Sequence, residues 1–256
     1  MNKFLRILVF NFKVETKFTV DYVIKLVIFM FHIIVFKQMW DYLLKDKAVL
    51  GYTKENMIWY IIIGEALLYT MSKNYIKISN MVKSGDIANI LIRPINVLEY
   101  IFLMEITTII NLFLNFIIAA IYGIMLTGFP SISTTNLILF FISVILSYII
   151  LLETQLLIGI LAFFFEENEV FYFIISKACL ITTMTPLNFF SGFSYSFMSC
   201  LPTTYIAYAP GRIFLNCNID LALHLILCQI LSFLVCTFLL IILTKKGVKK
   251  INVNGG

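Results

Sequence analysis

The chain has 256 residues, of which 61% are hydrophobic and only 13% are charged, and its formal net charge is +5. Soluble globular domains are much less apolar and more highly charged. The polar stretches are too short to fold as separate domains of ~40 residues or more. The composition therefore excludes a large soluble catalytic domain and favours one all-α integral membrane domain over residues 1–256.

The residues before the first apolar stretch have the pattern of a helix that lies in the membrane surface. At 100° per residue, Arg6, Lys13 and Lys17 fall on one stripe, and Phe4, Leu8 and Phe12 fall on another side. An interfacial helix among lipid headgroups is patterned in this way. The sequence predicts such a helix over residues 1–18, with no cleaved signal peptide because charged residues interrupt the apolar run.

Long apolar stretches follow one another from this point, separated by short polar connections. A helix needs roughly 20 apolar residues to cross ~30 Å of hydrocarbon. The sequence therefore predicts six transmembrane helices, at Val20–Phe36, Met57–Met71, Tyr100–Leu126, Leu137–Phe165, Val170–Phe190 and Leu221–Leu243. The second is short, and snorkelling side chains at its ends would extend it.

The distribution of lysine and arginine predicts the orientation of these helices, because cationic residues accumulate in cytoplasmic loops. Twelve cationic residues fall in the first tail, in the connection between spans two and three, and in the last tail, against five on the opposite side. We therefore expect both termini in the cytoplasm and the connection Thr127–Asn136 outside.

Residues 72–84, between spans two and three, form a second amphipathic pattern. A polar stripe opposes Tyr75, Ile78 and Val82, and consists of Lys73, Lys77, Asn80 and Ser84. Gly85 and Asp86 end this helix, and Pro94 prevents direct continuation into span three. The pattern is typical either of a membrane-anchoring elbow or of a docking surface. A break, a loop and a re-entry exceed what joining two helices requires, which favours docking of a cytosolic partner.

Two acidic residues, Glu65 and Glu153, fall at membrane depth. An ionised group costs about 2.5–3.5 kcal/mol there on insertion scales, so each should face protein or water. Either could hold helices together or line a pathway. Glu65 could pair with Lys25 or His32, and we expect Glu153 roughly 30 Å by helical rise from residues 72–84.

The third span carries a polar line, which occupies about a third of the helical wheel and consists of Glu105, Thr108, Asn111 and Asn115. Ser143, Ser147 and Thr154 lie on the fourth span. Such residues face other helices, where they hold a bundle together or border a substrate cavity. We favour the first interpretation.

The segment 192–220 is too interrupted for a span and too apolar for a solvated loop, since it contains Pro202, Pro210 and Gly211 among apolar residues. We expect a re-entrant segment that dips into the outer leaflet. The five cysteines have no metal-ligand spacing, and a disulfide between Cys200 and Cys217 is conceivable if the loop is outside.

Several ordered motifs resemble the ABC transporter type-2 permease family, whose members carry a similar stretch between spans two and three. That stretch is Ser84-Gly85-Asp86-Ile87 followed by Leu91-Ile92-Arg93-Pro94-Ile95-Asn96, after Gly51-Tyr52-Thr53 and Met57–Tyr60. Weaker agreements follow at Phe163-Phe164-Phe165-Glu166, Pro186-Leu187, Ser191-Gly192, Leu201-Pro202 and Ala209-Pro210. Phenylalanines stand near the fourth-span end, where many relatives have tryptophan.

The resemblance implies a six-helix exporter permease that pairs with a second permease, identical or similar, and with a separate ABC ATPase. Residues 1–18 and 72–84, with Gly85, Asp86 and Arg93, would contact that ATPase. Pro186, Gly192, Pro202 and Pro210 would belong to an outer gate. The sequence has no Gly-Xaa4-Gly-Lys-Ser/Thr phosphate loop, so ATP and magnesium are expected on the partner, and this chain is expected to be no enzyme and to hold no cofactor.

Two other classes of protein remain as alternatives. An intramembrane serine protease is suggested by Gly192-Phe193-Ser194 and His224, but Tyr195 stands where the second glycine should be. A secondary transporter or channel is the stronger alternative, although the sequence lacks an inverted repeat. The cargo is expected to be a hydrophobic or amphipathic peptide, drug or lipid, and no nucleic-acid partner is expected. The high content of Ile, Lys and Asn suggests a bacterium with an AT-rich genome, and so a bacterial plasma membrane. Small exporters of the class that the chain resembles often handle antimicrobial peptides there, which is an association with the fold alone.

Overall fold

The structure is a computed structural model that describes residues 19–44, 48–72, 74–91, 97–105, 108–165, 167–215 and 217–250. Within these ranges every regular element is a helix, and the only extended pairing is an isolated bridge between Val49 and Tyr52. The predicted all-α class is therefore confirmed for the described part of the chain.

The described helices are α2 Thr19–Leu44, α3 Lys54–Leu68, α4 Asn74–Lys83, α5 Ala88–Leu91, α6 Val97–Glu105, α7 Ile109–Thr127, α8 Thr134–Ile160, α9 Glu169–Met184, α10 Gly192–Cys200, α11 Thr204–Phe214 and α12 Ile219–Val248. Two short 3-10 helices, η2 Leu161–Phe163 and η3 Leu187–Phe189, follow α8 and α9. Among the described residues, four stretches are long and apolar enough to cross a membrane: Val23–Leu44, Ile109–Thr127, Thr134–Phe163 and Ile219–Val248. The chain is thus a multi-pass membrane protein.

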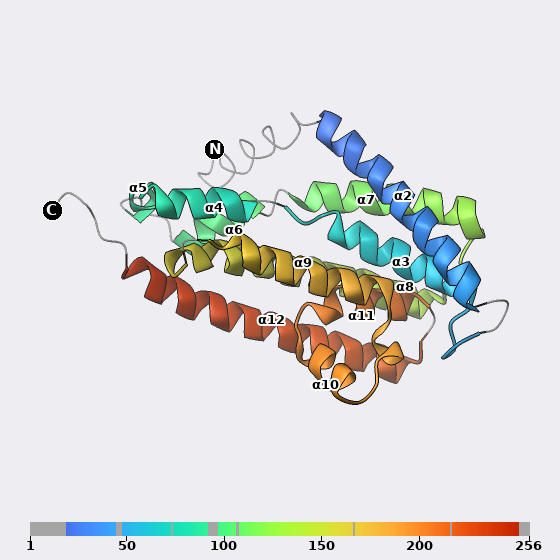
Figure 1. Ribbon diagram of the computed structural model, residues 1–256. Coiled ribbons are helices and arrows are strands. Elements are labelled where there is room, and N and C mark those ends of the chain that lie inside the picture. The colour runs from blue at the N-terminus through green and yellow to red at the C-terminus, as the bar shows by residue number, and fades with distance from the viewer. Residues whose placement is uncertain are drawn as a thin grey trace.

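The long helices form one elongated bundle (Figure 1). Helix α8 packs against α12 and α11, and α11 packs in turn against α3 and α9. Figure 1 shows α4, α5 and the C-terminal end of α12 at one end of the bundle, and α10 and α11 at the other. Among the described residues, α4 and the end of α12, which the charge distribution predicts to be cytoplasmic, therefore share one end, and α10 and α11, predicted to be outside, share the opposite end.

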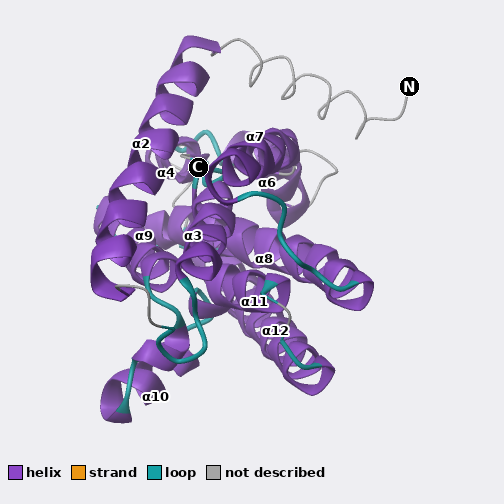
Figure 2. Cartoon of the chain, turned by 90° about the vertical axis from the view of Figure 1, so that its right-hand side faces the viewer, coloured by secondary structure: helices purple, strands orange, loops and turns teal. Residues whose placement is uncertain are grey.

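Helix α3 is the buried centre of the bundle, which Figure 2 shows from one end, along its long axis. Eleven of its fifteen residues are buried, and it packs against α2, α7, α9 and α11. Thr53 caps its first turn by accepting a hydrogen bond from the backbone N–H of Asn56. This helix is about 22 Å long, so the short apolar stretch at Met57–Met71 is explained by burial in protein rather than by contact with lipid.

The third and fifth predicted spans compare differently with the described helices. The third, expected to be continuous over Tyr100–Leu126, is described as α6 and α7, and residues 106 and 107 between them lie outside the described part of the chain. The fifth, expected to reach Phe190, ends at Met184, because Thr185 is extended before Pro186 and a residue preceding proline disfavours the helical conformation.

The segment 192–220 is more regular than expected, since it forms two helices and a short connection to α12. Most of α10 is exposed, whereas most of α11 is buried against α3 and α8. Pro210 is accommodated inside α11. A Cβ atom on Gly211 would lie 2.6 Å from Cδ2 of Tyr60, so only glycine permits this close approach of α11 to α3.

Candidate functional site

Helix α4 presents a polar face at one end of the bundle. Lys77, Asn80 and Ser84 are exposed, whereas Tyr75 and Ile78 are buried. This arrangement matches the amphipathic stripe that the sequence predicts, with helix bounds of Asn74–Lys83 instead of 72–84. Lys73 and Arg93, which belong to the same prediction, lie outside the residues whose structure is described, as does the whole predicted interfacial helix 1–18 with Arg6, Lys13 and Lys17.

The buried face of α4 is fixed to the end of α8. A Cβ atom on Gly159 would lie 2.8 Å from Cδ1 of Ile78, so α4 and α8 are in close contact. Ser79 donates a hydrogen bond to Oδ1 of Asn168 at 3.0 Å, and Asn168 donates through Nδ2 to the carbonyl of Ile158 at 2.9 Å. Asn168 is only 1% exposed, and therefore α4 is tied to α8 through a buried amide.

The N-terminal end of α4 packs against α9. The rings of Tyr75 and Tyr172 stack with 4.5 Å between their centroids and 18° between their planes. Burial and, to a smaller extent, Tyr172 and Glu169 raise the pKa of Tyr75. Its hydroxyl therefore stays protonated at neutral pH, and no charge disturbs this contact.

A tight turn ends α4 as expected. Gly85 has a φ of 78°, a conformation that glycine adopts without steric cost. The hydroxyl of Ser84 donates to Oδ2 of Asp86 at 2.6 Å, and both side chains are exposed. The exposed surface at this end of the bundle thus carries the cations of Lys77 and Lys83 beside the carboxylate of Asp86.

Glu65 is 1% exposed on α3 and lies beside His32 of α2. Glu65 Oε2 and His32 Nδ1 are 3.7 Å apart, and the hydroxyl of Tyr69 is 3.3 Å from the same Nδ1. Oε1 of Glu65 is buried without a hydrogen-bond partner in the described part of the chain. Of the two partners considered for Glu65, the structure selects His32. Lys25 instead lines a hollow between α2 and α7.

Glu153 joins α8 to α12, because the hydroxyl of Thr237 donates to its Oε1 at 2.5 Å. It lies six residues before Gly159, which contacts α4. Six residues rise about 9 Å along a helix. The expected separation of roughly 30 Å from the amphipathic helix is therefore wrong, because α4 packs against the side of α8 instead of projecting away from its end.

The polar line of the third span divides into residues with different surroundings. Asn115 donates through Nδ2 to Oγ1 of Thr70 at 3.2 Å, and so ties α7 to α3. Thr108 lies 3.0 Å from the hydroxyl of Tyr148 on α8. Asn111 lines the same hollow as Lys25. Glu105 is the last residue of α6, and its side chain lies outside the described part of the structure.

A buried glutamine on α12 organises the polar residues of α8. The Gln229 side chain is fully buried, donates through Nε2 to Ser147 Oγ at 2.8 Å and to the carbonyl of Tyr205 at 3.1 Å, and accepts from Ser143 at 2.9 Å. Ser143 and Ser147 therefore hold helices together, as favoured from the sequence. Thr154 bonds only within its own helix, to the carbonyl of Leu151.

Aromatic and polar side chains pack together at the end of the bundle that carries α10 and α11. The Arg212 guanidinium lies 5.0 Å from the ring centroid of Tyr52, and Tyr208 donates to Oδ1 of Asn188 at 2.6 Å. Pro186 precedes η3 and is buried, as is Pro210, whereas Gly192 is exposed with a φ of 56° and Pro202 is half-buried. The thiols of Cys200 and Cys217 are both free.

A family model described as ABC-2 family transporter protein matches residues 22–255. The chain belongs to the ABC-2 transporter family. The resemblance inferred from the motifs is therefore confirmed, and it extends over nearly the whole chain. No curated protein sequence matches the chain.

Membership makes this ABC-2 transporter a membrane permease, and the family implies association with an ABC ATPase and with the membrane. The described residues contain no group of three or more His, Cys, Asp or Glu side chains arranged to hold a metal ion. The arrangement is suited to transmitting force: the polar helix α4 is fixed by Asn168 to the long helix α8, which reaches the opposite end of the bundle.

Sequence reasoning missed two residues of this ABC-2 transporter, Asn168 and Gln229. Asn168 follows an acidic turn, and Gln229 is a lone amide in an apolar helix. Such an amide is expensive in the membrane unless it is satisfied, and this signal could have marked Gln229. Their hydrogen-bond partners are too far away in the sequence to be predicted: Gln229 and Ser143 are 86 positions apart, and Asn168 and Ser79 are 89 positions apart.

Proposed function

We propose that the chain is the membrane-spanning subunit of an ATP-driven exporter, which moves a hydrophobic or amphipathic cargo outward. In this proposal an ABC ATPase binds the polar face of α4 and supplies the energy, and ATP and magnesium bind to that partner. The attachment of α4 to α8 through Ser79, Asn168 and Ile158 carries the proposal. A partner that drives the bundle must push on a rigid element, and this attachment makes α4 rigid.

The charges on the exposed surface support a protein partner. Lys77 and Lys83 are exposed on α4, and Asp86 follows in the turn. Lys73 and Arg93 flank this surface in the sequence. Complementary charge across an interface guides association and fixes its register. We therefore expect an acidic surface on the ATPase, with the predicted helix 1–18 as a second contact.

The proposed topology has six spans, with α3 and α9 crossing beside the four long apolar stretches. Helix α9 has 16 residues and would be about 24 Å long. Both helices are shorter than the hydrocarbon thickness of ~30 Å. Helix α3 is buried inside the bundle, whereas α9 packs on α11 and α3 with only three of its sixteen residues buried. Protein neighbours on one side can complete the crossing of each. Both termini would then lie in the cytoplasm of a bacterium, and α10 and α11 would form the outer re-entrant segment.

The route of the cargo is proposed along the polar side chains of the spans. Its candidates are Glu65, Glu105, Asn111, Asn115 and Glu153, and its outer gate would include Pro186, Gly192, Pro202 and Pro210. A second permease subunit, identical or similar, would complete the route. An amphipathic peptide is the cargo that the composition of a bacterial exporter suggests. A secondary transporter or channel remains the alternative, and it requires no ATPase.

The experiment is co-purification of an ABC ATPase with the tagged chain, together with an assay of cargo export. Reversing both charges in Lys73→Glu/Lys77→Glu should abolish co-purification and export without preventing membrane insertion. The matched control is Lys245→Glu/Lys246→Glu, which reverses two exposed charges at the same end of the bundle. Glu153→Gln should also retain the ATPase.

Unchanged binding and export in the Lys73→Glu/Lys77→Glu variant would rule out α4 as the coupling element. Export that persists in a strain without any co-purifying ATPase would instead favour the secondary transporter.

A further inference from the structure

The exposed face of α9 is apolar except for one lysine at its centre. Val170, Phe173, Ile174 and Ile181 are between 47% and 60% exposed, and Lys177 is exposed among them. At 100° per residue these positions share one side of the helix, and the three buried residues of α9 lie on the opposite side. The side chain of Lys177 therefore points away from the rest of the chain.

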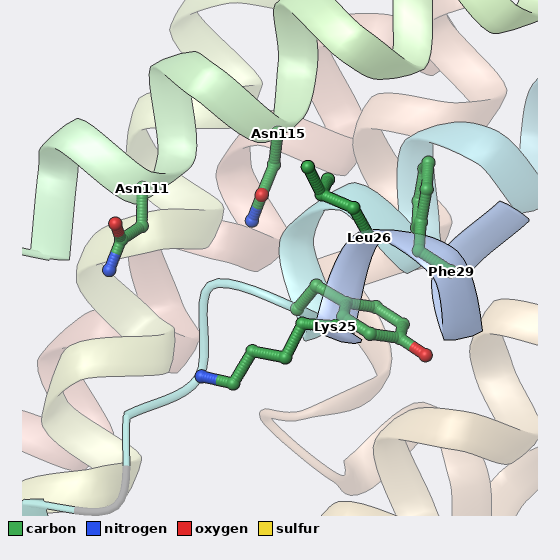
Figure 3. Close-up of a pocket in the computed structure, with 6 residues that line it drawn as sticks. Lys25, Leu26, Phe29, Asn111 and Asn115 are labelled. Carbon is green, nitrogen blue, oxygen red and sulfur yellow. The ribbon is translucent and has the colours of Figure 1, made fainter. Parts of the chain in front are cut away.

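Lys177 lies near the middle of the crossing that is proposed for α9. It is the ninth of sixteen residues, so about 12 Å of helix precede it and about 10 Å follow it. A lysine near a helix end can snorkel to the headgroups. Lys25 is such a lysine, as the third residue of the stretch Val23–Leu44, and Figure 3 shows it opposite Asn111 and Asn115 of α7. Lys177, two turns from either end of α9, stays at the depth of the hydrocarbon.

Neighbours on α9 do not neutralise this lysine. Its Nζ atom lies over the ring of Phe173, 5.3 Å from the centroid, and a ring attracts a cation without cancelling its charge. All residues from 167 to 187 are described, and the acids among them are Glu167 and Glu169. The nearer of these, Glu169, lies eight positions earlier, or about 12 Å along the helix.

The helices that pack against α9 supply no counter-charge either. These helices are α3, α8 and α11, and α11 contains no acidic residue. Glu65 of α3 is buried and faces His32, and Glu153 of α8 is buried and bonded to Thr237. Glu55 lies in the first turn of α3. A charged side chain within a span almost always faces protein or a water-filled cavity, and such residues mark substrate pathways. Whatever meets Lys177 therefore comes from outside this chain.

An identical second subunit does not supply the missing charge from the described residues. The exposed carboxylates of these residues all lie in connections or in the first turn of a helix: Glu55, Asp86, Glu99, Glu167, Glu169 and Asp220. None of them is at the depth of Lys177. Contact between two copies of α9 would moreover place two lysines together. The counter-charge is therefore best supplied by the transported molecule.

We propose that this face of α9 lines the cargo route and that Lys177 binds an anionic group, such as a carboxylate, of an amphipathic cargo. The inference rests on the proposed function and names the charge that the route selects. The ammonium donates charge-assisted hydrogen bonds to the anion, while Phe173, Ile174 and Ile181 contact the apolar part of the cargo. A cationic cargo is disfavoured, because like charges would meet in a medium of low dielectric constant.

The test uses the purified full-length chain in phosphatidylcholine nanodiscs without an ATPase. Two photoreactive amphiphiles with the same alkyl chain are compared, one with a carboxylate head and one with a trimethylammonium head, and mass spectrometry maps their cross-links. The carboxylate probe should label α9 at the lower concentration. Lys177→Gln should raise its half-maximal concentration about tenfold, and Lys177→Arg should retain it.

Lys25→Gln is the matched control, since it removes a cation from another apolar stretch, on α2. An equal loss in Lys177→Gln and Lys25→Gln would mean that only the overall charge attracts the probe. Equal labelling of α9 by both probes would mean that the anionic group is not recognised. Dissociation of a dimer in Lys177→Gln would mean that the lysine meets the second subunit. Each of these results would overturn the proposal.

Failure of this inference is distinguishable from failure of the proposed function. If the ATPase co-purifies and cargo is exported but labelling does not depend on Lys177, only the role of Lys177 is wrong. If labelling depends on Lys177 but no ATPase associates with the chain, only the ATP-driven mechanism is wrong.

Discussion

His32 and Glu65 face each other across the contact between α2 and α3, with 3.7 Å between Nδ1 and Oε2. The histidine side chain is 40% exposed and the carboxylate only 1%. The pair therefore connects the outside of the bundle to its buried central helix. His32→Ala would leave the carboxylate without this partner, and an unpaired buried polar group costs about 1–3 kcal/mol. We expect a lower unfolding temperature in detergent.

Two further variants make this prediction specific. In His32→Ala/Glu65→Gln the two effects should be less than additive, because the residues are in contact. Lys37→Ala removes the half-buried ion pair between Lys37 and Asp41, one turn apart on the same helix. Such pairs contribute less than about 1 kcal/mol, so this control should change little. Additive losses in the double variant would show that the two residues do not interact.

Gln229 is expected to be the most sensitive polar residue of α12. Gln229→Leu removes the hydrogen bonds that join α12 to Ser143, Ser147 and the carbonyl of Tyr205. Interhelical hydrogen bonds in membranes contribute roughly 0.6–2 kcal/mol each, so we expect the loss of three to cost about 2–6 kcal/mol in total. The measurement is unfolding by denaturant in mixed micelles.

Ser232→Ala is the control for Gln229→Leu. Ser232 lies on the same helix and is buried, but it donates only to the carbonyl of Cys228, one turn earlier. Its removal breaks no contact between helices. An equal loss of stability in both variants would contradict the role assigned to Gln229.

Gly211→Ala should disturb the packing of α11 on α3. The added Cβ atom would meet the ring of Tyr60 at 2.6 Å, and overpacking of this kind costs about 1–3 kcal/mol. Tyr60→Leu removes the ring, so the double variant Gly211→Ala/Tyr60→Leu should be less destabilised than the sum of the single variants. Protease sensitivity of the connection between α10 and α11 would report the local change. Strict additivity would mean that the clash is relieved elsewhere.

Gly159→Ala should affect coupling more than insertion. The added Cβ atom would approach Cδ1 of Ile78 at 2.8 Å and push α4 away from α8. We expect reduced ATPase co-purification and reduced export, with normal amounts of protein in the membrane. Ile78→Gly should restore both in combination, because it removes the whole side chain, including the Cβ atom of Ile78 that would lie 2.9 Å from the added one. If the Gly159→Ala variant alone exported cargo at the wild-type level, the close contact between α4 and α8 would not be required for coupling.

The sequence was sufficient to predict the elements that lipid and water distinguish. Helices α8 and α12 agree with their apolar stretches, and the exposed stripe of α4 agrees with its period of 3.6 residues. The central position of α3 was not predictable, because a residue that faces lipid and a residue that faces protein are both apolar, and the sequence does not distinguish them.

The individual polar contacts were predictable only in kind. Glu65 was expected to find a partner on the first span, and His32 is that partner. The predicted distance between Glu153 and α4 was wrong, because this distance depends on which side of α8 the helix α4 packs against. The partners of Asn168 lie on two other elements of the chain, so no spacing in the sequence connects them.

Asn168 also determines which helices must move together. Although α4 follows α3 in the chain, its side-chain anchors are on α8 and at the start of α9. A displacement of α4 by more than the length of a hydrogen bond would therefore either break the bonds of Asn168 or carry the end of α8 with it. A force on α4 would therefore act on α8 and, through the hydrogen bonds of Gln229 to Ser143 and Ser147, on α12.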